Sequence, residues 1–349
     1  MLYRLIRPLL FRLSPDVAHR VTMQALRVLS AVTPPVARRR AGTTAGTGVQ
    51  LLGLRFANPV GLAAGFDKSG RHIDALAQLG FGFIEVGTVT PRPQAGNPPP
   101  NLFRLVEDRA LINRMGFNND GAEAVARRLE KRRYRGVCGV NIGKNFDTPL
   151  EQASSDYLSC LRTVYATADY VTINISSPNT PGLRELQGAA SLDLLLLELV
   201  NARESLATRH GKRVPLLVKL APDLDDASLD SICGVLLKSG VDGVVATNTT
   251  TARPASLRSR YASEAGGLSG APLHPISLRV IRALRARLGP EFPIVGVGGI
   301  SSVETAHATF AAGANLIQLY SGFIYEGPGL ISRLTRETRC TSGPIRSTA

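Results

Sequence analysis

The chain has 349 residues, of which 44% are hydrophobic, and this is ample for one large domain with a buried core. Its net charge is +14, but eight arginines and a single acid in residues 1–40 carry half of that excess, so the total does not by itself indicate nucleic-acid binding. The four cysteines lack CxxC spacing, the five histidines form no HxxxH or HExxH pair, and no apolar run reaches eighteen residues, so we expect reduced thiols, no metal and no membrane-spanning helix.

The first 40 residues predict two short amphipathic helices. Apolar residues between Leu2 and Phe11 recur at helical spacing, with arginines between them. Ser14, Pro15 and Asp16 then supply an N-cap, a proline at the first helical position and an acid in the first turn. An arginine-rich polar side suits an anionic membrane surface, although packing on the domain explains the apolar face equally well. A secretory signal is disfavoured because arginines interrupt the apolar stretch.

From about residue 48 the chain alternates short apolar strands with amphipathic helices, which predicts an α/β fold, a parallel (β/α)8 TIM barrel. The strands are apolar throughout, as expected where both faces of a strand are covered. The alternative fold is a doubly wound sheet, for which we would expect an early GxGxxG turn, and this turn is absent. The predicted strands are 60–63, 83–87, 139–142, 171–175, 216–220, 243–247, 294–297 and 316–320, with helices near 69–80, 121–134, 151–167, 190–209, 225–239, 275–288 and 302–312.

Three further segments complete the predicted organisation. Residues 49–56 precede the first strand and predict a hairpin that closes the bottom of the barrel. Residues 102–106 and 111–113 predict an antiparallel excursion over the opposite, active face. We therefore expect an N-terminal helical extension at 1–40, a barrel at 41–338 and a disordered tail at 339–349.

The predicted strand ends are rich in amides and hydroxyls, with two lysines and little acid. Because catalytic groups in such barrels come from the carboxyl ends of the strands, this lining predicts an anionic ligand rich in carbonyl groups. The segment 173–184, INISSPNTPGLR, places the hydroxyls of Ser176 and Ser177 between the amides of Asn174 and Asn179. It indicates a base or a nucleophile among hydrogen-bond donors. An acyl-transfer nucleophile is disfavoured because no histidine or acid stands at the neighbouring strand ends.

A phosphate site is predicted after the last two strands. Residues 296–299 and the Ser321-Gly322 pair occupy the usual phosphate position of these barrels, although glycines also serve tight turns. Lys219 stands at a strand end inside the barrel mouth. Burial of its charge there would cost free energy unless an anionic partner compensated it. A flavin would provide one, because a lysine near the ring stabilises the anionic reduced form. An ion pair with Asp223 is the alternative.

Ten segments, in order, resemble dihydroorotate dehydrogenase of the membrane-associated, quinone-using class. The likeness runs from about residue 2 to about 335, and only the tail after Thr338 falls outside it. Phe66 stands where leucine is more familiar, and we expect this to change packing and not chemistry. The segments are NPVGLAAGFDK (58–68), GFIEVGTVTPRPQ (82–94), INRMGFNN (112–119), VNIGKN (140–145), INISSPNTPGLR (173–184), VKLAPD (218–223), ATNTT (246–250), GGLSG (266–270), GVGGI (296–300) and QLYSGF (318–323).

The resemblance implies an FMN enzyme that oxidises (S)-dihydroorotate to orotate in pyrimidine biosynthesis, with a membrane quinone as final electron acceptor. Ser177 matches the catalytic base, with Thr180 and Phe117 as relay and lid partners. Substrate-binding positions are matched by Lys68, Asn113, Arg114, Met115, Gly116, Phe117, Asn174, Asn179, Asn248 and Thr249. FMN-binding positions are matched by Ala64, Gly65, Phe66, Asp67, Lys68, Thr88, Asn141, Asn174, Lys219, Thr247, Gly270, Gly299, Tyr320 and Ser321.

Two features decide the class within the family. The soluble class has cysteine where Ser177 stands and lacks the N-terminal helices, whereas this chain has both the serine and the helices. The helices are then expected to form an apolar tunnel for a lipid quinone, with His19, Arg104 and Tyr320 along its path. The implied protein is a monomer at the cytoplasmic face of the inner (cell) membrane and binds no nucleic acid.

Two rival functions make different predictions. A tRNA dihydrouridine synthase, another FMN barrel, would use the positive charge for RNA, but its catalytic cysteine and C-terminal helical domain are not evident here. A basic scaffold barrel that docks on membranes would be colourless when purified, whereas a flavoprotein would be yellow.

Overall fold

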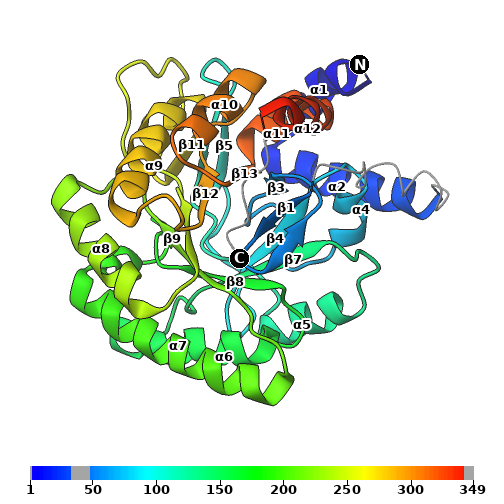
Figure 1. Ribbon diagram of the computed structural model, residues 1–349. Helices are drawn as coiled ribbons and strands as arrows, with labels where there is room; N and C mark the ends of the chain where they lie inside the picture. The colour runs from blue at the N-terminus through cyan, green and yellow to red at the C-terminus, as the bar shows by residue number, and fades with distance from the viewer. Residues whose placement is uncertain (1, 33–47, 342–349) are drawn as a thin grey trace.

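Eight parallel strands form a closed barrel, which confirms the predicted fold (Figure 1). The computed structural model describes residues 2–32 and 48–341. Around the barrel the strands are β3 (Val60–Leu62), β4 (Phe83–Val89), β7 (Val137–Ile142), β8 (Tyr170–Asn174), β9 (Leu216–Leu220), β10 (Gly243–Ala246), β12 (Ile294–Val297) and β13 (Leu316–Leu319). Their near-complete burial explains why they are apolar on both faces.

Helices surround the barrel and cover its outer face (Figure 1). They are α4 (Ile73–Ala77), α5 (Ala122–Glu130), α6 (Ala153–Val164), α7 (Ala189–His210), α8 (Asp226–Ser239), α9 (His274–Leu288) and α10 (Val303–Ala311). The first of these is shorter than the predicted 69–80. The Asp67 carboxylate accepts hydrogen bonds from the backbone N–H groups of Arg71 and His72, at 2.9 and 2.7 Å, and holds this stretch in a turn that delays the helix.

The lower half of the barrel interior is filled with apolar side chains. A Cβ at Gly61 would lie 2.3 Å from the Phe83 ring, and one at Gly139 would lie 2.1 Å from the Tyr170 ring, so these glycines make room for the two aromatic rings. The hairpin of β1 (Val49–Leu51) and β2 (Leu54–Phe56) packs against this cluster from below, as predicted. Among the described residues, the barrel is therefore closed at this end, and the first cavity lies at the carboxyl ends of its strands.

A three-stranded antiparallel sheet lies beyond the barrel strands. The predicted excursion forms β5 (Leu102–Leu105) and β6 (Ala110–Asn113), and β6 also pairs with β11 (Gly267–Gly270). No strand is predicted for β11 from the sequence, because a glycine-rich segment lacks the side chains typical of strands. Small residues are required there, since a Cβ at Gly267 would lie 1.9 Å from the Thr249 hydroxyl oxygen.

The two predicted N-terminal helices are present as α1 (Leu2–Arg12) and α2 (Pro15–Val32). The α1 helix lies beside the C-terminal helices α11 (Ser321–Glu326) and α12 (Gly329–Thr341) (Figure 1). Tyr3 donates a hydrogen bond to the Ile324 carbonyl oxygen, and Arg7 donates one to that of Tyr325 at 2.9 Å. Among the described residues, no helix combines the length and apolar character needed to cross a bilayer.

The predicted domain boundaries are covered only in part. Residues 33–47, which contain the predicted start of the barrel domain at 41, lie outside the described residues, as do 342–349. The α12 helix runs to Thr341, so the first three residues of the predicted tail are helical. The next helix-breaking residues in the sequence, Gly343 and Pro344, come later than the predicted boundary.

Candidate active site

Two adjacent cavities open near the carboxyl ends of the strands. The first, of about 930 Å³, occupies the mouth of the barrel. The second, of about 1460 Å³, lies between the barrel and the helices α1 and α2. Gly65, Lys68, Met115 and Tyr320 line both, so the cavities share a wall.

Most of the predicted site residues line the first cavity. Of the predicted substrate-binding residues only Arg114 does not; it pairs instead with Glu264 at 2.7 Å. Of the predicted cofactor-binding residues, Phe66 and Asp67 line the second cavity, and Asn141 lies behind the first, hydrogen-bonded to residues of its wall. The predicted residues that line the first cavity are Ala64, Gly65, Lys68, Thr88, Asn113, Met115, Gly116, Phe117, Asn174, Ser177, Asn179, Lys219, Thr247, Asn248, Thr249, Gly270, Gly299, Tyr320 and Ser321.

The two serines of the loop after β8 have different surroundings. Ser177 lines the cavity, and its hydroxyl oxygen accepts a hydrogen bond from the backbone N–H of Asn179 at 3.2 Å. Ser176 is fully buried; its hydroxyl donates to Asn174 Oδ1 at 3.2 Å and accepts from Asn248 Nδ2 at 3.0 Å. Ser177 is therefore the serine that faces the cavity, and Ser176 lies behind the cavity wall.

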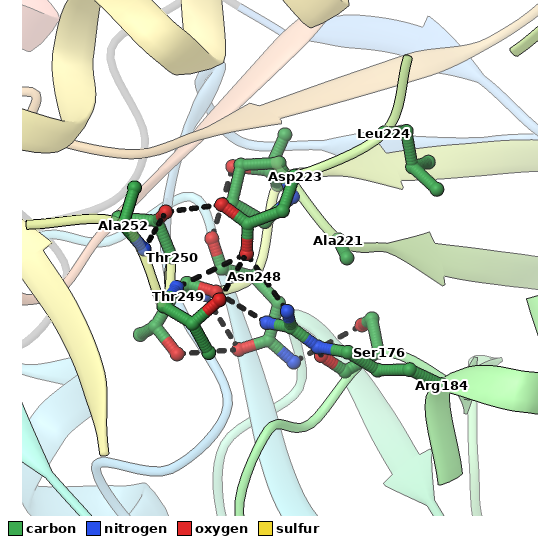
Figure 2. A network of polar contacts seen from close by, with 12 residues as sticks. Ser176, Arg184, Ala221, Asp223, Leu224, Asn248, Thr249, Thr250 and Ala252 are labelled. Carbon is green, nitrogen blue, oxygen red and sulfur yellow. Dashed lines mark hydrogen bonds and ion pairs between the residues drawn. The ribbon is translucent and has the colours of Figure 1, made fainter. Parts of the chain in front are cut away.

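Arg184 ties this loop to the neighbouring strand ends (Figure 2). Its guanidinium donates to the carbonyl oxygens of Ser176 and Thr249, at 3.1 and 2.9 Å, and pairs with Asp223 at 2.7 Å. Burial alone would raise the pKa of Asp223, but hydrogen bonds from Thr250 and Thr251 together with Arg184 hold it below its usual range.

The alternative of a Lys219–Asp223 ion pair is wrong, because Asp223 pairs with Arg184 and, among the described residues, no ion pair joins it to Lys219. Lys219 is buried, and within the described ranges its ammonium forms no ion pair. Burial lowers the pKa of Lys219, whereas Glu85 raises it. Lys219 thus presents a buried amino group to the cavity, and an anionic ligand there would stabilise its charged form.

A buried polar network supports the cavity floor. The Asn174 amide donates to Thr88 Oγ1 at 2.8 Å and to Asn141 Oδ1 at 3.1 Å, and Asn141 donates to Glu85 at 2.8 Å. Glu85 is fully buried and also accepts hydrogen bonds from Tyr170 and Gln318, at 3.0 and 2.7 Å. Glu85 and Gln318 are not among the predicted site residues, although a single acid inside the apolar run 83–89 was a usable signal for Glu85.

Glycines shape the part of the cavity after β12. Gly298, Gly299 and Gly270 have φ values of +131°, +69° and +96°. A Cβ at Gly299 would lie 2.6 Å from His274 Cβ and 2.7 Å from the Gly270 carbonyl oxygen. Only glycine fits this arrangement, which leaves bare backbone beside the Ser321 hydroxyl, as the sequence predicted for a phosphate group.

The loop after β6 covers the cavity from above. Phe117 has a φ of +56°, and its ring lies against Gly143, where a Cβ would be 2.9 Å from it. Asn113 accepts a hydrogen bond from Asn179 at 3.1 Å, which joins this loop to the one that carries Ser177. Lys68 donates to Met115 Sδ at 2.8 Å and to Asn118, and burial lowers the pKa of Lys68 to about 7.

The second cavity brings together the three residues predicted for the quinone path, His19, Arg104 and Tyr320. The Phe66 ring packs against two of them, with centroid distances of 5.3 Å to His19 and 5.6 Å to Tyr320. Burial lowers the pKa of His19 to about 4 and raises that of Tyr320 to about 12, so both are neutral at pH 7. The Arg104 guanidinium lies 4.3 Å from the centroid of Phe11 and donates to its carbonyl oxygen at 3.0 Å.

No metal centre is seen in the parts of the chain that are described. Those parts contain no group of three or more His, Cys, Asp or Glu side chains that could hold a metal ion. The cavity walls offer instead amides, hydroxyls, bare backbone and two lysines.

Known proteins match this chain over nearly its whole length. The family model for dihydroorotate dehydrogenase matches residues 47–340. Proteins named dihydroorotate dehydrogenase (quinone) from Aromatoleum aromaticum and Paraburkholderia xenovorans are 52% and 54% identical, over 97% of this chain in each case and 95% and 99% of those proteins. A crystal structure of dihydroorotate dehydrogenase from Eimeria tenella in complex with ferulenol superposes with a TM-score of 0.86 at 39% identity, covering 93% of this chain and 90% of that one. With the barrel, the cavity at its mouth and these matches in agreement, the chain belongs to the dihydroorotate dehydrogenase family.

Proposed function

We propose that this enzyme oxidises dihydroorotate to orotate in the first cavity, with FMN as hydride acceptor, and delivers the electrons to a quinone in the second. The observation that carries this proposal is the wall that the two cavities share. A flavin held there would be reachable by a polar substrate from one side and by an apolar quinone from the other. The reaction belongs to pyrimidine biosynthesis.

The residues of the first cavity fit FMN. The glycines after β12 and the Ser321 hydroxyl would hold the phosphate, because backbone N–H groups without a side chain beside them suit an anion. Lys219 would hold the ring edge that becomes negative on reduction. FMN supplies the acceptor for the hydride. The protein residues bind and orient both molecules and move the proton.

Ser177 is the base in this proposal. Its hydroxyl takes the proton from the carbon next to the ring carbonyl of dihydroorotate, while the hydride leaves the adjacent carbon. A serine hydroxyl is a weak base, so its own proton has to pass on, and buried Thr180 nearby in the chain is the proposed relay. The amides of Asn113, Asn179 and Asn248 and the Lys68 ammonium provide donors and acceptors for the carboxylate, carbonyl and N–H groups of the substrate.

The N-terminal helices are the proposed membrane contact. Leu5 and Leu9 on α1 are 75% and 62% exposed, and Val28 on α2 is 65% exposed. Apolar side chains in such helices, next to arginines, favour insertion at an anionic lipid surface. A quinone dissolved in the lipid would then enter the second cavity between the helices. We propose that the protein acts as a monomer bound peripherally to the cytoplasmic face of the cell membrane.

Anaerobic mixing of the purified yellow protein with dihydroorotate tests the chemistry. We expect the flavin absorbance to bleach, and a protein without flavin, or a flavin that stays oxidised, would contradict the proposal. The membrane contact is tested with the double variant L5E/L9E, which should bind anionic vesicles less and be reoxidised more slowly by a quinone in those vesicles. The control L194E/L197E changes two leucines on α7 of similar exposure, 65% and 56%, and should behave as the unmodified protein. Equal losses in both variants would refute a specific role for α1.

A further inference from the structure

A third cavity lies between α2 and the helices α4 and α5. Its volume is about 1240 Å³, which is ample for a small ligand. Three parts of the chain line it: one side of α2 between Gln24 and Ser30, the residues 70–75 that lead into α4, and residues at the end of α5 and just after it, between Arg128 and Arg133. The chemistry proposed above gives this cavity no role.

The lining of the third cavity is strongly cationic. Asp74 is its one carboxylate among the described residues, and it pairs with Arg133 at 3.5 Å. Asp120 and Asp169, outside the lining, pair with three more of its arginines at 2.6 to 3.0 Å. Six cations against these three carboxylates leave an excess of three positive charges, and buried Asp67, behind the turn, lowers the excess to two when it is ionised. The six cations are Arg27, Arg71, Arg128, Lys131, Arg132 and Arg133.

Two of these cations have no carboxylate partner. Arg27 on α2 and Lys131 after α5 are exposed, and within the described ranges neither forms an ion pair. A guanidinium and an ammonium group that both line one cavity favour a ligand that brings negative charge and several acceptor oxygens. A phosphate group provides both.

The exposed apolar side of α2 runs to the edge of this cavity. Val17, Val21, Gln24 and Val28 follow one another at intervals of three or four residues, so they lie on one face of the helix. The three valines are 40%, 48% and 65% exposed, and Gln24 lines the cavity. When Val28 lies in the lipid, as proposed above, the cavity therefore opens at the boundary between lipid and water. Phospholipids carry their phosphates at that depth, which favours a lipid over a soluble phosphate compound.

We propose that the third cavity binds the phosphate headgroup of an anionic phospholipid, with Arg27 and Lys131 as the groups that contact it. The inference rests on the proposed membrane contact of the N-terminal helices, and it adds a defined site to the general attraction between arginines and an anionic surface. The walls of the site come from α2 and from the barrel helices α4 and α5. One bound lipid thus ties α2 to the barrel and holds the entrance of the second cavity at the membrane.

The double variant R27Q/K131Q tests this site, because it removes the two unpaired charges and breaks no ion pair. Binding is measured by sedimentation with vesicles of equimolar phosphatidylcholine and phosphatidylglycerol, and we expect the Kd to rise about tenfold or more. The control R12Q/R20Q removes the same charge from exposed positions of α1 and α2 outside the cavity, and we expect a rise of about threefold at most. Equal losses in the two double variants would indicate general attraction and overturn the proposal.

A soluble lipid separates the site from the membrane contact. Calorimetric titration with dihexanoyl phosphatidylglycerol, below its critical micelle concentration, measures binding to the cavity when no membrane is present. We expect the unmodified protein to bind this lipid, and R27Q/K131Q to bind it about tenfold more weakly while it keeps the melting temperature of the unmodified protein. No binding to the unmodified protein would overturn the site. If this lipid binds but vesicles do not, the proposed membrane contact fails and the site stands.

Glycerol phosphate identifies the source of the phosphate. It carries the same phosphate without acyl chains, so we expect it to bind the unmodified protein at least about tenfold more weakly than the short-chain lipid. Equal affinities for the two compounds would assign the cavity to soluble phosphate compounds and overturn the assignment to a lipid.

Discussion

Replacing Ser177 with alanine should slow catalysis and leave stability unchanged, whereas replacing the neighbouring Ser176 should lower stability and have less effect on catalysis. Ser177→Ala removes the proposed base, and loss of a general base slows a reaction by about 10²–10⁴-fold, or about 3–5 kcal/mol of barrier. It should hardly change stability, because the hydroxyl accepts only one hydrogen bond, from the Asn179 backbone at 3.2 Å.

Ser176→Ala should do the reverse. It leaves Asn248 Nδ2 without its acceptor at 3.0 Å and takes a donor from Asn174, beside a Ser176 position that is itself fully buried. An unsatisfied buried polar group costs about 1–3 kcal/mol, so the free energy of unfolding should fall by about that amount. Flavin reduction should slow by less than about tenfold, since Ser176 does not line the cavity.

Two measurements on the same preparations check this. Anaerobic stopped-flow mixing with dihydroorotate gives the rate of flavin reduction, and denaturant unfolding gives stability. Each serine variant is the control for the other, because the same atom is removed one residue apart. Reduction of the Ser177→Ala protein within tenfold of wild type, or a slower rate in Ser176→Ala than in Ser177→Ala, would refute the assignment of the base.

Two further predictions concern the lid and the second cavity. Gly143→Ala places a Cβ 2.8 Å from Thr88 and 2.9 Å from the Phe117 ring, so we expect a KM for dihydroorotate about tenfold higher, or about 1.4 kcal/mol of lost binding. Gly234→Ala in α8 has open space around it and is the control; an unchanged KM in Gly143→Ala would argue against a lid role for Phe117. The pKa of His19 is about 4 when folded and 6.5 when unfolded, so neutral His19 contributes stability that is fully present above pH 6.5 and lost as the pH falls through 4. The melting temperature of wild type should therefore drop more between pH 7 and pH 4 than that of His19→Gln, and parallel curves would contradict the burial of His19 in a neutral form.

The barrel could be predicted because its strands are buried on both faces and appear as unbroken apolar runs. In such barrels the functional side chains stand at the carboxyl ends of the strands. This rule located residues of the first cavity such as Ser177, Asn174 and Lys219. The rule depends only on the direction of parallel strands, and it therefore needs no knowledge of distant contacts.

Features that depend on contacts far apart in the sequence were harder to predict. The partner of Asp223 is Arg184, which reaches it from a different loop, and neither residue indicates the other in the sequence. The β11 strand exists because β6 pairs with it and because the approach to Thr249 leaves no room for a side chain. Glu85 was overlooked for a similar reason, since its three donors come from three other strands.

The contact of α1 with α11 and α12 has a consequence for biosynthesis. The α1 helix is synthesised more than 300 residues before Ile324 and Tyr325, whose carbonyl oxygens hold it. The amphipathic N-terminus therefore lacks this part of its docking surface until α11 has been synthesised, and before then it can contact only earlier elements such as β5, through Arg104 and Phe11. During that interval a lipid surface or a chaperone can cover its exposed apolar side chains, and the second cavity is completed only when the segment 320–328 has folded.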